Sequence, residues 1–71
     1  MPIIDITLSP GRSSEKLKGL IGAITVAASE SLEIPASKVR VLLHEVPDAH
    51  WATGGVTIEE EKQHAAESSG R

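Results

Sequence analysis

The length of this chain is its strongest constraint, because a domain of 71 residues buries too small a share of its surface to be comfortably stable alone. Small folds are usually stabilised by disulfides, by metal ions or by self-association. The sequence contains no cysteine, which removes disulfides and every thiolate metal site. We therefore expect a single domain that associates with copies of itself.

Composition argues against several kinds of partner. The formal net charge is −3, and Trp51 is the only residue among Phe, Trp and Tyr. A protein that binds nucleic acid would normally show a basic face and aromatic stacking platforms. No apolar run is long enough for a signal peptide or a membrane span. The sequence therefore predicts a cytoplasmic protein with no nucleic-acid partner and no membrane partner.

The predicted fold consists of two apolar strands on either side of one helix. Residues 2–8 are rich in β-branched side chains and alternate between two faces. Ser13 stands where a helix N-cap belongs, and an apolar pattern of helical period then continues towards Pro35. Residues 39–46 alternate again. A helix that crosses between two strands of one sheet makes them parallel, so the sequence predicts an α/β (α+β) fold with one β-α-β unit.

One apolar stripe on the predicted helix covers one face of this sheet. The other face also carries apolar residues and remains bare, so it must be covered by other copies of the chain. The sequence therefore predicts an oligomer of several chains. The stripe comprises Leu17, Leu20, Ile21, Ile24, Ala27, Ala28, Ser31 and Leu32.

The remainder of the chain divides into a loop, a short strand and a polar tail. Residues 49–55, AHWATGG, are typical of a loop, and residues 56–58 complete a short C-terminal hairpin. Residues 59–71 are polar, and we expect a flexible tail with one helical turn capped by Thr57 and Glu60. The predicted domain therefore spans residues 1–58.

Pro2 is the first candidate for catalysis, because removal of Met1 would expose its secondary amine. An α-amino group ordinarily titrates around pH 7.7 to 8, and apolar walls with neighbouring cations shift such a pKa towards neutrality. A base in this range suits proton transfer. The alternative is that Met-Pro begins the chain for no chemical reason, which is the commoner case for this dipeptide taken alone.

Two arginines are candidates for binding an anionic substrate. Arg12 lies between the first strand and the helix, and Arg40 lies on the second strand. Each can direct a rigid fork of donors at a carboxylate, and two forks suit a dicarboxylate. In the alternative interpretation, Arg12 is a solvated loop charge and Arg40 pairs with an acid at a subunit contact.

A tryptophan and several histidines remain to be interpreted. Trp51 can wall a pocket around the amine or fill the core beneath its loop, the commoner fate of a lone tryptophan. A metal site is not predicted, because no helical pair at ligand spacing occurs. The residues considered for a metal are His44, Glu45, His50 and His64.

The order of these motifs resembles the short members of the 4-oxalocrotonate tautomerase family, without gaps from Pro2 to Gly55. Any one motif is weakly specific, but all of them in this order and spacing are strongly specific. The motifs are PIIDITL at 2–8, GRS at 11–13, VRVLLHEV at 39–46 and HWATGG at 50–55.

The resemblance implies a cofactor-free isomerase that forms a homohexamer, a trimer of dimers. Such an enzyme moves a proton between enol and keto forms of unsaturated 2-oxo acids such as 2-hydroxymuconate, in the catabolism of aromatic compounds. Pro2 would be the acid and base. Arg12 would draw electron density into the distal carboxylate, and Arg40 of a neighbouring subunit would hold the 2-hydroxyl or 2-oxo group and the near carboxylate.

The sequence also departs from the family at the implied substrate-binding residues. Trp51 replaces the usual phenylalanine as the hydrophobic wall, and Ser9 and Thr53 stand where the family often has aliphatic residues. The implied pocket is narrower and more polar, which leaves a biosynthetic tautomerase with another substrate as an alternative. One branch of the related dehalogenases has an acidic residue at the position of Thr53 to activate water, and related decarboxylases have an aspartate at that of Lys38. Neither chemistry is therefore expected of this chain. A non-catalytic oligomeric module is the alternative outside enzymes.

Overall fold

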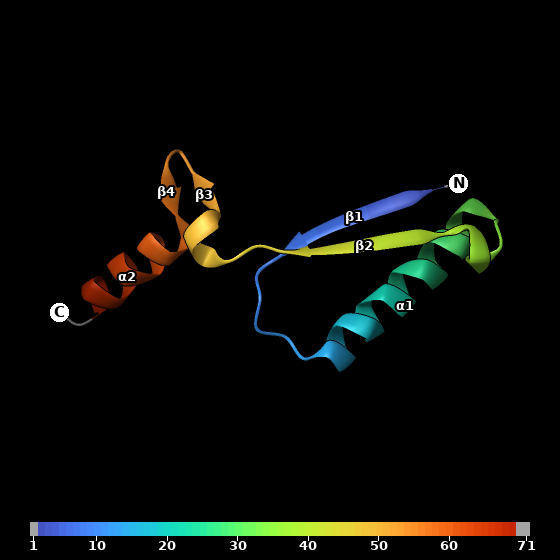
Figure 1. Ribbon diagram of the computed structural model, residues 1–71, viewed down its shortest axis with the longest axis horizontal. Coiled ribbons are helices and arrows are strands. Elements are labelled where there is room, and N and C mark those ends of the chain that lie inside the picture. The colour runs from blue at the N-terminus through green and yellow to red at the C-terminus, as the bar shows by residue number, and fades with distance from the viewer. Residues whose placement is uncertain (1, 70–71) are drawn as a thin grey trace.

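The structure is a computed structural model that describes residues 2–69, and side chains are described for residues 2–64. It confirms the predicted α+β fold, in which a β-α-β unit is followed by a C-terminal hairpin (Figure 1). Two short 3-10 helices lie between the main elements. The elements in chain order are β1 (Ile3–Leu8), α1 (Ser14–Leu32), η1 (Ala36–Lys38), β2 (Arg40–Glu45), η2 (Asp48–His50), β3 (Ala52–Thr53), β4 (Val56–Thr57) and α2 (Ile58–Ser69).

The strands β1 and β2 are parallel neighbours, as predicted. Ile3 lies opposite Arg40, and Leu8 lies opposite Glu45. Exposure alternates along both strands, because successive side chains of a strand point to opposite faces of the sheet. The half-buried face lies against α1 (Figure 1) and comprises Ile4, Ile6, Leu8, Val41 and Leu43. The exposed face comprises Ile3, Asp5, Thr7, Arg40, Leu42 and His44.

Helix α1 begins and ends with recognisable caps. The Ser13 hydroxyl accepts a hydrogen bond from the Lys16 N–H at 3.2 Å, which satisfies one of the free donors of the first turn. At the other end Glu33 adopts a left-handed conformation, with φ 56°, and its N–H donates to the Ser29 carbonyl. Pro35 then follows at a position where the helix has already ended.

The sheet covers only part of the predicted apolar stripe on α1. Leu17, Leu20, Ile24 and Ala28 are half-buried, but the other predicted members are exposed. The reason is that the two-stranded sheet is narrower than the helix. Neighbouring strands lie about 4.8 Å apart, whereas a helix with its side chains is about 10 Å across. Two strands therefore leave part of the helix uncovered. The exposed members are Ile21, Ala27, Ser31 and Leu32.

The chain does not close a core of its own. None of the residues whose side chains are described is buried, and Ile3 and Leu42 on the uncovered sheet face are 60% and 41% exposed. The radius of gyration is 16.8 Å, whereas a compact chain of this length would have roughly 11 Å. Figure 1 shows why, because the hairpin and α2 extend away from the β-α-β unit.

The C-terminal hairpin forms as predicted. β3 and β4 are antiparallel, with Ala52 opposite Thr57 and Thr53 opposite Val56. Gly54 and Gly55 connect them with φ values of 61° and 82°, the positive values that a two-residue turn of type I′ requires at both positions.

Helix α2 is longer than the single helical turn that the sequence predicted. Its cap is the predicted one, because the Thr57 N–H donates to Glu60 Oε1 at 3.1 Å and the Glu60 N–H donates to the Thr57 hydroxyl at 3.1 Å. This reciprocal pair is a capping box. It starts a helix that continues to Ser69, and no described helix is long and apolar enough to cross a membrane.

The capping box predicts that α2 is sensitive to acid. Hydrogen bonds from the Thr57 main-chain N–H and hydroxyl lower the pKa of Glu60 below its ordinary value. A carboxyl whose folded pKa is lowered stabilises the fold above its unfolded pKa, and this contribution is lost as pH falls through the folded pKa. We expect circular dichroism to show loss of helix below about pH 4. The loss should be smaller in Glu60→Gln than in Glu59→Gln, its matched control. Equal acid profiles for these variants would contradict this role of Glu60.

Candidate active site

Pro2 and Arg40 lie together at the amino ends of the parallel strands. The Arg40 N–H donates to the Pro2 carbonyl at 3.1 Å. Pro2 is half-buried, while Arg40 projects on the exposed face of the sheet. The fold thus places the candidate base and one candidate arginine at the same end of the sheet. That a neighbouring subunit supplies Arg40 stays a prediction.

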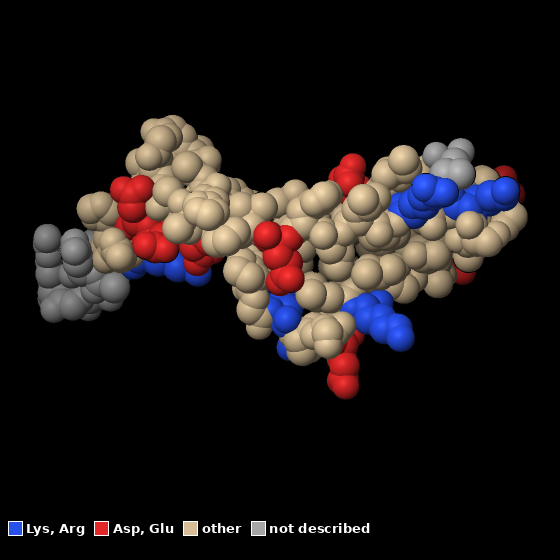
Figure 2. Space-filling view, viewed as in Figure 1, with Lys and Arg blue, Asp and Glu red and all other residues tan. Residues whose placement is uncertain are grey.

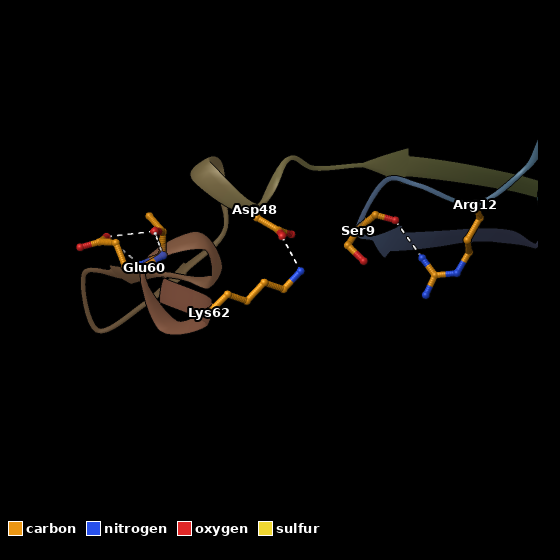
Figure 3. Close-up of polar contacts among 6 residues, drawn as sticks. Ser9, Arg12, Asp48, Glu60 and Lys62 are labelled. Carbon is orange, nitrogen blue, oxygen red and sulfur yellow. Dashed lines mark hydrogen bonds and ion pairs between the residues drawn. The ribbon is translucent and has the colours of Figure 1, made fainter. Parts of the chain in front are cut away.

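Arg12 and Ser9 lie at the opposite end, in the loop that follows β1. Arg12 Nη1 donates to the Ser9 carbonyl at 2.8 Å, so the side chain folds back on its own loop (Figure 3). Ser9 is half-buried and Arg12 is exposed. The Ser13 cap fixes the next residue at the start of α1.

One chain does not bring Pro2 and Arg12 to a common site. They lie on either side of β1, which is six residues long and so extends roughly 20 Å at the usual rise per residue. Arg12 is separated from Arg40 in the same way, because β2 runs parallel to β1 in register. A small molecule can contact both ends of this sheet only if different chains contribute them.

Trp51 and Thr53 form a separate group on the hairpin. Trp51 is half-buried, and its carbonyl accepts a hydrogen bond from the Ile58 N–H at 2.8 Å. Thr53 is exposed on β3. An ion pair holds α2 against η2, because Lys62 Nζ lies 2.7 Å from Asp48 Oδ2 (Figure 3).

The charges are unevenly distributed over the molecule. Figure 2 shows Lys and Arg side chains near the end where β1 begins and over α1, whereas Asp and Glu gather over α2. The basic residues of this end include Lys38 in η1 and Arg40 in β2. Pro2 precedes β1 at this end, and a cation close to an amine favours its neutral form.

Sequence reasoning did not identify the pairing of Asp5 with His44. His44 Nε2 lies 3.2 Å from Asp5 Oδ1 on the exposed sheet face. Strand alternation assigned each residue to a face of its own strand, but the register that brings β1 and β2 together was needed to pair them. The hydrogen bond from Arg12 to the Ser9 carbonyl was missed for a similar reason, because it depends on the conformation of the intervening loop.

Known sequences similar to this chain are tautomerases. The sequence profile of the family described as "Tautomerase enzyme" matches residues 2–61. The chain is 48% identical over 56 residues to the "Probable tautomerase" of Ralstonia nicotianae, covering 79% of this chain and 80% of that protein. It is 38% identical over 60 residues to the 2-hydroxymuconate tautomerase of Comamonas testosteroni, covering 84% and 95%.

Similar solved structures lead to the same family. TomN, a 4-oxalocrotonate tautomerase homologue of the tomaymycin biosynthetic pathway, superposes with a TM-score of 0.83 at 39% identity, covering 87% of this chain and 95% of TomN. The heterohexamer 4-oxalocrotonate tautomerase of Chloroflexus aurantiacus gives a TM-score of 0.78 at 37% identity, covering 84% and 97%. The chain therefore belongs to the tautomerase family and is an isomerase. These neighbours confirm its resemblance to the 4-oxalocrotonate tautomerases.

Proposed function

We propose that this protein is a cofactor-independent tautomerase that transfers a proton between the enol and keto forms of unsaturated 2-oxo dicarboxylic acids such as 2-hydroxymuconate. The observation that carries the proposal is the position of Pro2, directly before β1 at the amino ends of the two strands and bonded through its carbonyl to the main chain of Arg40. Family membership and the 2-hydroxymuconate tautomerase of Comamonas testosteroni support it.

In the proposed reaction, the Pro2 amine is both base and acid. It removes the proton from the enol oxygen, and the electron pair of the O–H bond moves through the conjugated system. The protonated amine then delivers a proton to carbon, so that a C–H bond replaces the O–H bond. No oxidant or reductant is needed, because substrate and product have the same composition. A base near neutral pH suits both steps.

The two arginines have different proposed roles. Arg40 holds the 2-oxo or 2-hydroxyl group and the near carboxylate, and Arg12 binds the distal carboxylate, where negative charge develops. Because these residues lie at opposite ends of the sheet in one chain, the proposal requires at least two chains at each site. Arg40 from a neighbouring subunit is part of this proposal.

Trp51, Ser9 and Thr53 are the proposed lining of the pocket. The indole of Trp51 provides an apolar wall, while the hydroxyls of Ser9 and Thr53 add hydrogen-bonding groups. A more polar lining would suit a substrate other than 2-hydroxymuconate. The second candidate function is therefore tautomerisation of an enol in a biosynthetic pathway. The similarity to TomN of the tomaymycin biosynthetic pathway supports this candidate. Both functions use the same amine and differ in the substrate.

We propose that the functional assembly is a homohexamer, a trimer of dimers. The absence of any buried residue among those with described side chains supports self-association, as does the apolar surface around Ile3 and Leu42. The Chloroflexus aurantiacus relative is a heterohexamer. Association would cover the bare sheet face and bring the two ends of different chains together.

The first prediction from the proposed function concerns this assembly. Leu42→Glu places a charge on the uncovered sheet face, and burying that charge without a partner is costly. We expect analytical ultracentrifugation to show a hexamer of the 7.5 kDa chain for the wild type and smaller species for the variant. Val26→Glu is the matched control, since Val26 is 54% exposed on the side of α1 away from the sheet. A well-folded wild-type monomer at micromolar concentration would refute the shared site.

The second prediction concerns the arginines. Arg12→Ala and Arg40→Ala each remove charge-assisted hydrogen bonds to the substrate, and we expect kcat/KM for 2-hydroxymuconate to fall on the order of tenfold or more. Arg40→Ala should affect both KM and kcat, because it holds the reacting end. Lys18→Ala removes an exposed cation of α1 and is the control. Near wild-type kinetics for both arginine variants would exclude a dicarboxylate substrate.

The third prediction concerns Pro2 and tests the proposed function most directly. With Met1 attached, the Pro2 nitrogen is a tertiary amide whose lone pair is delocalised, so it is no base. Mass spectrometry of active protein should show that Met1 is absent, and a Met1-retaining or N-acetylated form should be almost inactive. Pro2→Ala should keep a weaker activity through its primary amine.

The pH profile provides a separate measurement on the same amine. Since nearby cations and apolar walls disfavour the protonated amine, the rising limb of activity should report a pKa below the ordinary α-amino range of about 7.7 to 8. Full activity from chains that retain Met1 would rule out the mechanism.

A further inference from the structure

The loop between β1 and α1 holds the Arg12 side chain in a defined position. Arg12 Nη1 donates to the Ser9 carbonyl at 2.8 Å, which closes a ring over residues 9–12 (Figure 3). The next residue, Ser13, caps α1. The guanidinium is therefore held by its own hydrogen bond, and the main chain of Arg12 is held by the helix that follows it.

Gly11 sets the conformation that makes this hydrogen bond possible. Its φ is +113°, in the region that favours glycine, because other residues have a Cβ atom that clashes with their own backbone there. A Cβ added at Gly11 would meet no atom outside its neighbours within 4 Å. Substitution by alanine would therefore change the preferred backbone conformation without filling any occupied space.

We infer that Gly11 is a positioning residue for the distal carboxylate of the substrate, acting through Arg12. The inference rests on the proposed function and extends it. A guanidinium has five N–H donors in a planar fork, and the Ser9 carbonyl accepts from one of them. The other donors stay available in a fixed orientation, so less side-chain entropy is lost when they bind a carboxylate.

The consequence is a preference for diacids over monoacids that depends on backbone conformation. An Arg12 released from the Ser9 carbonyl would keep its charge but lose its fixed orientation. Binding of a distal carboxylate would then weaken, whereas binding of the near carboxylate, assigned to Arg40, would not change. Loss of the fold would instead weaken both.

The experiment uses a matched pair of unreactive ligands, trans,trans-muconate and sorbate, which differ in the distal carboxylate. Isothermal titration calorimetry would measure both affinities for the full chain with Met1 removed. The proteins would be the wild type, Gly11→Ala, Arg12→Ala, the double variant, and Gly22→Ala. Gly22 is the matched control, because it is a glycine of α1 with equally open space around its Cβ position.

We expect the wild type to bind muconate more tightly than sorbate, on the order of tenfold. Gly11→Ala should remove most of this preference by weakening muconate binding alone, and Gly22→Ala should keep it. In the double variant, Gly11→Ala should have no effect beyond that of Arg12→Ala, because a residue that acts through another is not additive with it.

Two results with the alanine variants and the wild type would overturn the inference. One is an additive loss in the double variant, which would mean that Gly11 acts independently of Arg12. The other is equal binding of muconate and sorbate by the wild type, which would mean that no distal carboxylate is recognised. Neither result depends on turnover, so a wild type that tautomerises enols through Pro2 would retain the proposed proton transfer while this inference failed.

A second variant covers the case in which Gly11→Ala does not assemble. Arg12→Lys keeps the positive charge, but an ammonium group cannot bond the Ser9 carbonyl and present a planar fork at once. We expect it to lose most of the preference for muconate. Full preference in Arg12→Lys would show that charge alone suffices and would equally overturn the inference.

Discussion

The parallel pairing of β1 with β2 determines where Pro2, Arg12 and Arg40 lie. It begins with the hydrogen bond from the Arg40 N–H to the Pro2 carbonyl and ends with that from the Val46 N–H to the Leu8 carbonyl. The pairing places the candidate amine at the amino ends of the two strands. It places the Arg12 loop and the start of the segment that leads to the hairpin at their carboxyl ends. If this register slipped by one residue, the strand faces would exchange. The open face would then lose Arg40.

Much of this arrangement could be predicted from the sequence, because it depends on local periodicity. Alternation identified both faces of β1 and β2, and Ser13 and Thr57 marked the starts of the helices. The extent of α2 was underestimated, since a polar composition was given more weight than a correctly identified capping box. The exposure of Ile21 and Leu32 could not be predicted either, because it depends on how many strands lie beneath α1.

The separation of Pro2 from Arg12 illustrates what a sequence pattern cannot provide. Both residues were identified as members of one site, and within one chain a whole strand lies between them. Motif spacing specifies the order of residues along one chain. A site shared between chains depends on contacts between subunits, and these contacts cannot be read from that order. The burial of the described side chains agrees with this, because none of residues 2–64 is buried within one chain. Folding of the domain and completion of the site would both depend on association.

The location of Pro2 and Arg12 at opposite ends of one chain also affects how defects combine. In the proposed oligomer, a chain that has lost its amine still lends its arginine loop to a neighbour, and a chain that has lost the loop still offers its amine. Mixed assemblies of two impaired chains would therefore contain some intact sites. Two copies of the gene could lose different functional residues, one at each end of the sheet. Their products would then be active only in a mixed assembly. This division of labour is open to any small enzyme whose monomer places the parts of its site too far apart to use them alone.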